Sequence, residues 1–373
     1  MSHLKRTSYM SLVLSLVLTA CGGGGGGSNS STSTGASTPS PSNTPAPVAS
    51  ASPTADPSQT VTTATLAAQA YLNAARNECG FGSINTSNAL SLAANDANNY
   101  YVNRVAENDL SYVHDQTLGK TGYTGNTPIQ RATYRNYPNA NSSSGLTGSP
   151  RVTETLTTGA LPLGYAYQSL NTAGEAMAQS LLNTVYHLGA NMLPLRDVGT
   201  SLIKSTSPDG IERYRLTFLQ GDLTLVDTGK TGQDRARTYP CQGSRVPNQF
   251  SPSQESPNPA PDVGSRVTGT PILIQVPQGI TPVILSASVK NTRTNQLVPV
   301  RPIQNGCTNP IPGDLTGCNR GESSFDAAQA FLLPMDPLEA NTTHQVVITL
   351  NNLPQITFSF TPTSAINPVI VKK

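Results

Sequence analysis

Residues 22–60 consist mostly of Gly, Ser, Thr, Pro and Ala, and Asp56 is their only charged residue. A segment with so little apolar surface cannot offset the entropy cost of ordering, so we expect a disordered tether. As a flexible coil its 39 residues would span about 35–40 Å r.m.s.. Any hydrophobic core must therefore be built from residues 61–373.

The residues before the tether have the pattern of an export signal. Lys5 and Arg6 precede an apolar run over residues 10–18, which is too short to span a bilayer. The run leads into Leu18-Thr19-Ala20-Cys21, which resembles the bacterial lipobox. The resemblance implies a lipoprotein signal peptide at residues 1–20 and an acylated Cys21 at the head of the tether, residues 21–60.

A lipid on Cys21 would anchor the chain in a membrane, and two or three acyl chains on one Cys hold a protein stably. The residue after it is Gly22 rather than Asp, which resembles outer-membrane sorting in Gram-negative bacteria. We therefore expect an extracytoplasmic lipoprotein of the cell envelope. An ordinary signal peptide with a chance Cys is the alternative.

The charge balance excludes one class of partner. Charged residues make up 12% of the chain, about half of the usual share. The formal net charge of +2 comes from Lys5 and Arg6, because residues 1–20 hold no Asp or Glu. The chain after the signal peptide is formally neutral. It has no basic excess to neutralise phosphates, so we expect no nucleic-acid partner.

The composition changes near residue 240. Eleven of the 13 Tyr lie between Tyr71 and Tyr214, whereas 18 of the 30 Pro lie from Pro240 onward. A change this sharp predicts a domain boundary. We expect a first domain over residues 61–238, a Pro-rich linker over 239–264 and a second domain over 265–373.

The first domain has helical patterns followed by strand patterns. Apolar spacing predicts helices near residues 66–79 and 90–104, the second capped by Thr86 or Ser87. Thr172-x-x-Glu175 fits a capping box and predicts a third helix over about 173–191. Two strand-like runs, 198–204 and 211–219, flank turn residues at 207–210. Together these elements predict an α+β domain.

The second domain has short β-rich runs separated by Pro, Gly and Asn, at 271–276, 283–289, 296–300, 345–350 and 355–360. This spacing predicts an all-β, Ig-like sandwich. His344, between Thr343 and Gln345, is expected on the surface of a strand.

Four cysteines remain besides Cys21, and four allow three pairings. Cys307 and Cys318 share one loop rich in Gly, Pro and Asn, which favours a Cys307–Cys318 disulfide. Cys79–Cys241 would then join the first helix to the predicted linker. No C-x-x-C is present, so a zinc ribbon or a thioredoxin-type site is not supported.

The catalytic motifs G-x-S-x-G and H-E-x-x-H are absent from the sequence, and G-x-G-x-x-G occurs only within the poly-Gly run at residues 22–27 of the tether. The chain has four His. His3 lies in the signal peptide and His344 in the second domain. His114 and His187 are therefore the candidates for a site.

The order of motifs around these two His resembles the short bacterial form of the CAP superfamily (cysteine-rich secretory proteins, antigen five and pathogenesis-related proteins). The matching positions are Leu72-Asn73-x-x-Arg76-x-x-x-Gly80, His114, Arg131 six residues before Tyr137, Glu154, and Tyr186-His187 ahead of Val198-Gly199. The resemblance covers about the whole first domain. The sequence departs from the family pattern in four ways: Asn136 replaces the usual Gly, and Thr155 the usual Asn. The Arg often seen after the His is also missing after His187, and no second Glu lies near His187.

The resemblance implies a three-layer α-β-α sandwich with a central cleft. His114, Glu154 and His187 would converge there, beside Arg131 and Tyr137. In the family such His and Glu residues can hold a divalent metal, and two imidazoles with one carboxylate suit Zn or a similar ion. Alternatively, Arg131 and Glu154 make a structural salt bridge, and His187 only satisfies hydrogen-bonding groups at the end of its helix, where a cation suits the helix dipole.

Three functions remain open. The preferred one is a surface-displayed binding module for a lipid, glycan or protein, because the long tether favours presentation. The second is a hydrolase, for instance a protease, with His114 or His187 as base and Glu154 orienting it. The third is a purely structural envelope protein.

Overall fold

The computed structural model describes residues 63–109, 114–138, 152–206, 210–221, 236–277, 279–305, 325–364 and 370–372. Cys21 and the predicted Cys307–Cys318 disulfide lie outside the described residues. The described residues form both helices and strands, which confirms the predicted mixed α+β class. Within these ranges, no helix has the length and apolar character needed to cross a membrane.

The first two predicted helices are confirmed. α1 (Thr63–Glu78) ends just before Gly80, which takes a φ of 75° that glycine adopts without strain. α2 (Asn88–Ala106) begins after Ser87, whose side chain accepts a hydrogen bond from the backbone N–H of Leu90. Ser87 is therefore the N-cap, one of the two residues that the sequence offered.

A four-stranded sheet forms the centre of the first part. Its order is β1 (Asn85–Thr86), β4 (Asp197–Thr206), β5 (Glu212–Gly221), β2 (Val152–Leu161). The last three are antiparallel neighbours, and β1 runs parallel to β4. β4 and β5 are the two predicted strand-like runs.

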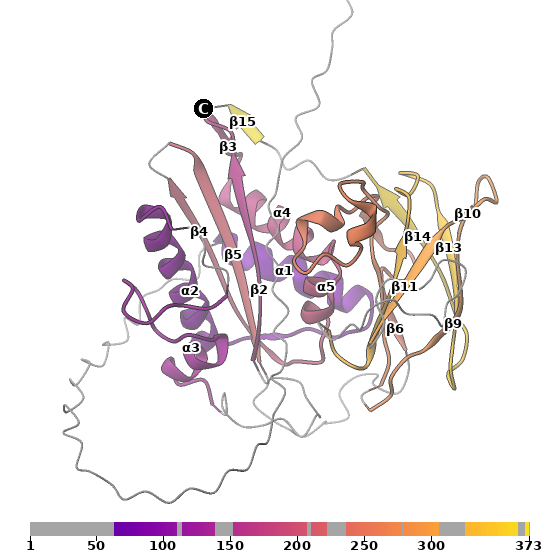
Figure 1. Cartoon of the computed structure of the whole chain (residues 1–373), viewed down its shortest axis with the longest axis horizontal. Coiled ribbons are helices and arrows are strands. Elements are labelled where there is room, and N and C mark those ends of the chain that lie inside the picture. The colour runs from indigo at the N-terminus through magenta and orange to yellow at the C-terminus, as the bar shows by residue number, and fades with distance from the viewer. Residues whose placement is uncertain are drawn as a thin grey trace, which may run out of the picture.

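Helices cover both faces of this sheet (Figure 1). α2 and α3 (Pro128–Tyr134) pack on one face, and α1, α4 (Leu170–Leu182) and α5 (Tyr186–Asn191) pack on the other. Gly199 of β4 allows α2 to approach closely, because a Cβ there would lie 1.9 Å from the carbonyl carbon of Leu90.

The predicted third helix is two helices, α4 and α5. The N-cap of α4 is Ser169, whose Oγ accepts a hydrogen bond from the Thr172 backbone N–H at 3.1 Å. The capping box predicted at Thr172 and Glu175 is therefore wrong. The helix breaks near residue 183 because Glu255, distant in sequence, accepts the first backbone N–H groups of α5.

The second part contains two sheets. One has the order β10 (Leu297–Val298), β9 (Ile284–Asn291), β13 (His344–Leu350), β14 (Ile356–Thr363), β7 (Arg245–Pro247). The other has the order β11 (Val300–Gln304), β12 (Gln329–Pro334), β8 (Ile272–Gln275), β6 (Arg237–Tyr239). Each of the five predicted β-rich runs overlaps one of these strands: β8, β9, β10, β13 or β14.

Residues 239–264 do not form the predicted extended linker. β6 and β7 add strands to the two sheets, and 3-10 helices follow at Pro252–Gln254 and Pro261–Val263. Phe250 and Ala260 belong to the same hydrophobic core as the helices α1 and α4. Pro252 and Pro261, two of the Pro residues that suggested a linker, instead start 3-10 turns, where a missing N–H costs little.

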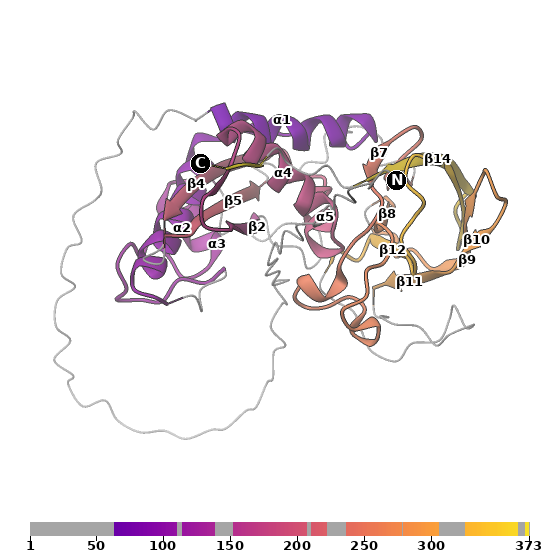
Figure 2. The same cartoon turned by 90° about the horizontal axis from the view of Figure 1, so that it is seen from above.

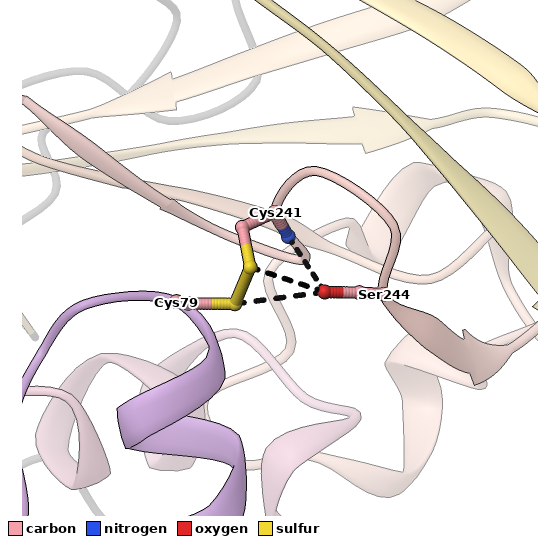
Figure 3. The surroundings of a disulfide bond; sticks show 3 residues. All are labelled: Cys79, Cys241 and Ser244. Carbon is pink, nitrogen blue, oxygen red and sulfur yellow. Dashed lines mark hydrogen bonds between the residues drawn. A yellow bond between two sulfur atoms is a disulfide. The ribbon is translucent and has the colours of Figure 1, made fainter.

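Both parts of the chain are tied together. The C-terminal strand β15 (Ile370–Lys372) pairs antiparallel with β3 (Tyr165–Tyr167) of the first part, beside the start of α4 (Figures 1 and 2). The predicted Cys79–Cys241 disulfide is present (Figure 3), and it links the end of α1 to the segment between β6 and β7. Ser244 Oγ accepts a hydrogen bond from the Cys241 backbone N–H at 3.0 Å.

Candidate functional site

Glu154 lies on β2, directly opposite Leu219 of β5. Residues opposite each other in an antiparallel pair share a face, and Leu219 packs with residues of α2 and α3. The Glu154 carboxylate therefore points into the layer between the sheet and these two helices, where 1% of the side chain is exposed. A carboxylate this buried requires charged or hydrogen-bonding partners.

Arg131 and His114 supply those partners. Arg131 Nη2 donates to Glu154 Oε2 at 2.6 Å, and His114 Nδ1 lies 2.9 Å from Glu154 Oε1. Burial alone would raise the pKa of Glu154, but the Arg131 guanidinium and the His114 ring outweigh burial and lower the pKa to about 2. Glu154 is therefore ionised at neutral pH. We call these three residues the His114–Glu154–Arg131 cluster.

Arg131 also orders the loop that carries His114. Its Nη1 donates to the backbone carbonyls of His114 (2.9 Å), Asn126 (3.0 Å) and Gly125 (3.4 Å). Gln116 closes the same loop, because its Oε1 accepts the backbone N–H of Thr124 at 2.7 Å. The Arg131–Glu154 pair is therefore a structural salt bridge, which was the alternative interpretation of these two residues. It also positions His114.

Tyr137 is buried on the same face of the sheet. Its hydroxyl donates to Asp197 Oδ2, at the start of β4, at 2.9 Å. Its ring packs on Gly221, where a Cβ would lie 2.8 Å from the ring atoms. Tyr137 therefore packs at the end of β4 and β5 in the layer that holds the cluster.

His187 lies on the opposite face of the sheet. It belongs to α5, whose Asn191 side chain accepts a hydrogen bond from Thr155 Oγ1 at 3.1 Å. Thr155 follows Glu154 on β2, so the two side chains point to opposite faces. The predicted convergence of His114, Glu154 and His187 is wrong because the sheet lies between His187 and Glu154.

The partner of His187 is Glu255, which sequence reasoning missed. His187 Nδ1 lies 3.3 Å from Thr184 Oγ1 and 3.5 Å from Glu255 Oε1. Glu255 also accepts the backbone N–H groups of Val185 and Tyr186 at 2.9 and 2.8 Å. Its carboxylate is fully buried. No local signal marks Glu255, because its partners lie about 70 positions earlier in the chain.

The predicted metal site is not assembled. Within the described ranges, no group of three or more His, Cys, Asp or Glu side chains could hold a metal ion. Both oxygens of Glu154 are engaged by Arg131 and His114. His187 Nε2 is buried and has no hydrogen-bond partner in the described part of the chain, but one imidazole does not make a zinc site. These residues do not fit a divalent ion.

Comparisons with known proteins add little to the description of this site. No family model matches the chain, and no curated protein matches it. Among solved structures, the chain is similar to an outer surface protein from Borrelia burgdorferi, with a TM-score of 0.25 and 14% sequence identity. The match covers 44% of this chain and 96% of that chain.

Proposed function

We propose that the chain is a lipid-anchored, extracytoplasmic binding module of the CAP superfamily. Helices on both faces of a four-stranded sheet support a CAP-type α-β-α sandwich in the first part. The two sheets of the second part support an Ig-like sandwich. The export signal, Cys21 and the tether support anchoring in the outer membrane of a Gram-negative bacterium.

The His114–Glu154–Arg131 cluster is the observation that carries the binding function. The His114 ring forms its outer edge, since 11% of that side chain is exposed against 1% for Glu154 and 0% for Arg131. Glu154 holds the ring, and Arg131 holds the backbone carbonyl of the same residue. A side chain ordered in advance binds a ligand at a lower entropy cost. A glycan, lipid or protein ligand would meet this ring first.

His114→Ala is expected to weaken binding by about tenfold, which is about 1.4 kcal/mol and the upper end of the range for one ordinary hydrogen bond. The measurement uses the full chain with Cys21→Ser, so that no lipid anchor contributes, against an immobilised glycan panel and phosphatidylglycerol vesicles. Asp115→Ala, at the exposed neighbouring position, is the matched control and should bind like the parent. Absence of binding in both arms, or equal binding by His114→Ala, would contradict the proposal.

A hydrolase is the second candidate, and the 2.9 Å contact of His114 Nδ1 with Glu154 favours it. A carboxylate at Nδ1 orients the ring and makes Nε2 the nitrogen that takes a proton in general-base catalysis. Cleavage of casein or of p-nitrophenyl esters that is lost in His114→Ala and kept in Asp115→Ala would replace the binding module with this function.

The anchor has its own test. Cells that express the wild-type chain should incorporate labelled palmitate into it, and the chain should fractionate with membranes. Cys21→Ser should remain unlabelled, because the acyl chains have no other site of attachment in the lipobox. An unlabelled wild type would show that residues 1–20 are an ordinary signal peptide.

A further inference from the structure

The end of the second part holds a polar pocket away from the His114–Glu154–Arg131 cluster. His344, the first residue of β13, pairs directly with Asn291, the last residue of β9. His344 is 1% exposed and Asn291 7% exposed. The expectation of a surface position for His344 is wrong, because the residues of β13 alternate between buried and half-buried and His344 is the first of the buried ones. Both residues line a pocket of about 290 Å³.

The hydrogen bond of His344 fixes which ring nitrogen can accept. Its Nδ1 lies 2.9 Å from the backbone carbonyl oxygen of Thr342. A carbonyl only accepts, so Nδ1 carries the proton and Nε2 keeps its lone pair in the neutral ring. Burial lowers the pKa of His344, which favours this neutral form. In the described part of the chain Nε2 has no hydrogen-bond partner.

Asn291 is held rigidly beside His344. Its Nδ2 donates to Glu339 Oε2 at 2.7 Å, and its Oδ1 accepts the backbone N–H groups of Arg293 and Thr294 at 2.9 and 3.1 Å. Glu339 is also paired with the Arg293 guanidinium, so this carboxylate is neutralised. The floor of the pocket is therefore built before any ligand arrives.

The rim combines polar and apolar side chains. Asp336 lines it with a carboxylate that has no hydrogen-bond or ion-pair partner among the described residues. Gln296 adds an exposed amide, which can both donate and accept. Leu297, 67% exposed, and Pro337 supply apolar surface on the same pocket.

We propose that this pocket binds one sugar ring of an extracytoplasmic glycan. A sugar presents several hydroxyl donors together with apolar C–H surface, and the pocket presents acceptors on His344 and Asp336 beside Leu297 and Pro337. Its volume, about 290 Å³, lies at the small end of ligand pockets, which suits one ring. Anions are disfavoured by Asp336. The site is separate from the cluster around His114, so each can fail without the other.

The test titrates the full chain, carrying Cys21→Ser, with methyl glycosides of glucose, galactose, mannose, N-acetylglucosamine and N-acetylgalactosamine. At least one is expected to bind and to shift the ¹⁵N resonance of His344 Nε2, while that of the buried His187 stays fixed. Asp336→Ala should weaken binding by about tenfold or more, since a hydrogen bond to a charged group is lost.

Gln355→Ala serves as the matched control, because Gln355 is exposed beyond the other end of β13. It should bind the same glycoside as the parent does. The proposal is overturned if no glycoside binds, if Asp336→Ala binds as well as Gln355→Ala, or if methylammonium binds at His344 and the sugars do not.

Discussion

Glu154→Gln is expected to lower the free energy of unfolding by about 3–5 kcal/mol, the usual cost of removing one partner from a buried ion pair. Arg131 is 0% exposed, and Glu154→Gln would remove the charge of the carboxylate that its guanidinium pairs with in this buried layer. The measurement is equilibrium unfolding in urea near neutral pH. Glu175→Gln is the matched control: Glu175 is exposed on α4, so its replacement should change stability by less than about 0.5 kcal/mol. Equal effects of the two changes would contradict the buried pair.

The Arg131–Glu154 pair also predicts that the folded chain becomes less stable at acid pH. The pKa of Glu154 falls from its ordinary 4.5 to about 2 in the folded chain. A carboxyl group whose pKa is lower in the folded chain stabilises the fold fully at pH values above its pKa in the unfolded chain. This stabilisation is lost as the pH falls toward its pKa in the folded chain. The wild type should therefore lose about 3 kcal/mol more than Glu154→Gln between about pH 5 and pH 2, at about 1.4 kcal/mol per pKa unit.

Removing the Cys79–Cys241 disulfide is the second large expected effect. The bond closes a loop with a sequence separation of 162. The double variant Cys79→Ala/Cys241→Ala should lose about 2–5 kcal/mol, because the unfolded chain regains the freedom that so long a loop removes. Thermal unfolding with and without dithiothreitol measures this: reductant should lower the melting temperature of the wild type by more than it lowers that of the double variant.

The variant Cys307→Ala/Cys318→Ala distinguishes the effect of reducing Cys79–Cys241 from the effect of reducing the other cysteines. That variant keeps Cys79 and Cys241, so its melting temperature should still fall on reduction. If reductant has no effect on it, the stabilising disulfide is not the one that joins α1 to the segment after β6.

Local patterns predicted α1, α2, β4, β5 and one strand for each β-rich run of the second part, whereas α3, β2, β12 and β15 were not predicted. Ser87 is the N-cap of α2, Gly80 follows the end of α1, and β-rich runs between Pro, Gly and Asn marked β13 and β14, because each signal depends on residues a few positions apart. The same reasoning failed where a distant residue decided the outcome. Glu255 starts α5 and breaks the single helix that apolar spacing favoured.

The candidate site was predicted in part for a similar reason. The grouping of His114, Arg131 and Glu154 followed from the order of motifs in a family resemblance. The position of His187 depended on which face of β2 carries Glu154, and a one-residue change in phase exchanges the faces. That phase is set by pairing with β5 and by packing of Leu219 on α2 and α3. None of these contacts has a signature near Glu154 in the sequence.

The ionisation state of Glu154 is the most direct test of the cluster, because both the ordered His114 ring and the buried Arg131 depend on an ionised carboxylate. Selective ¹³C labelling of glutamate side chains, with Glu154 assigned through Glu154→Gln, allows its titration to be followed by NMR in the full chain. We expect a pKa of about 2, with the His114 ring resonances shifting at the same transition. A Glu154 carboxylate that titrates near its ordinary value of 4.5 would contradict the proposed cluster.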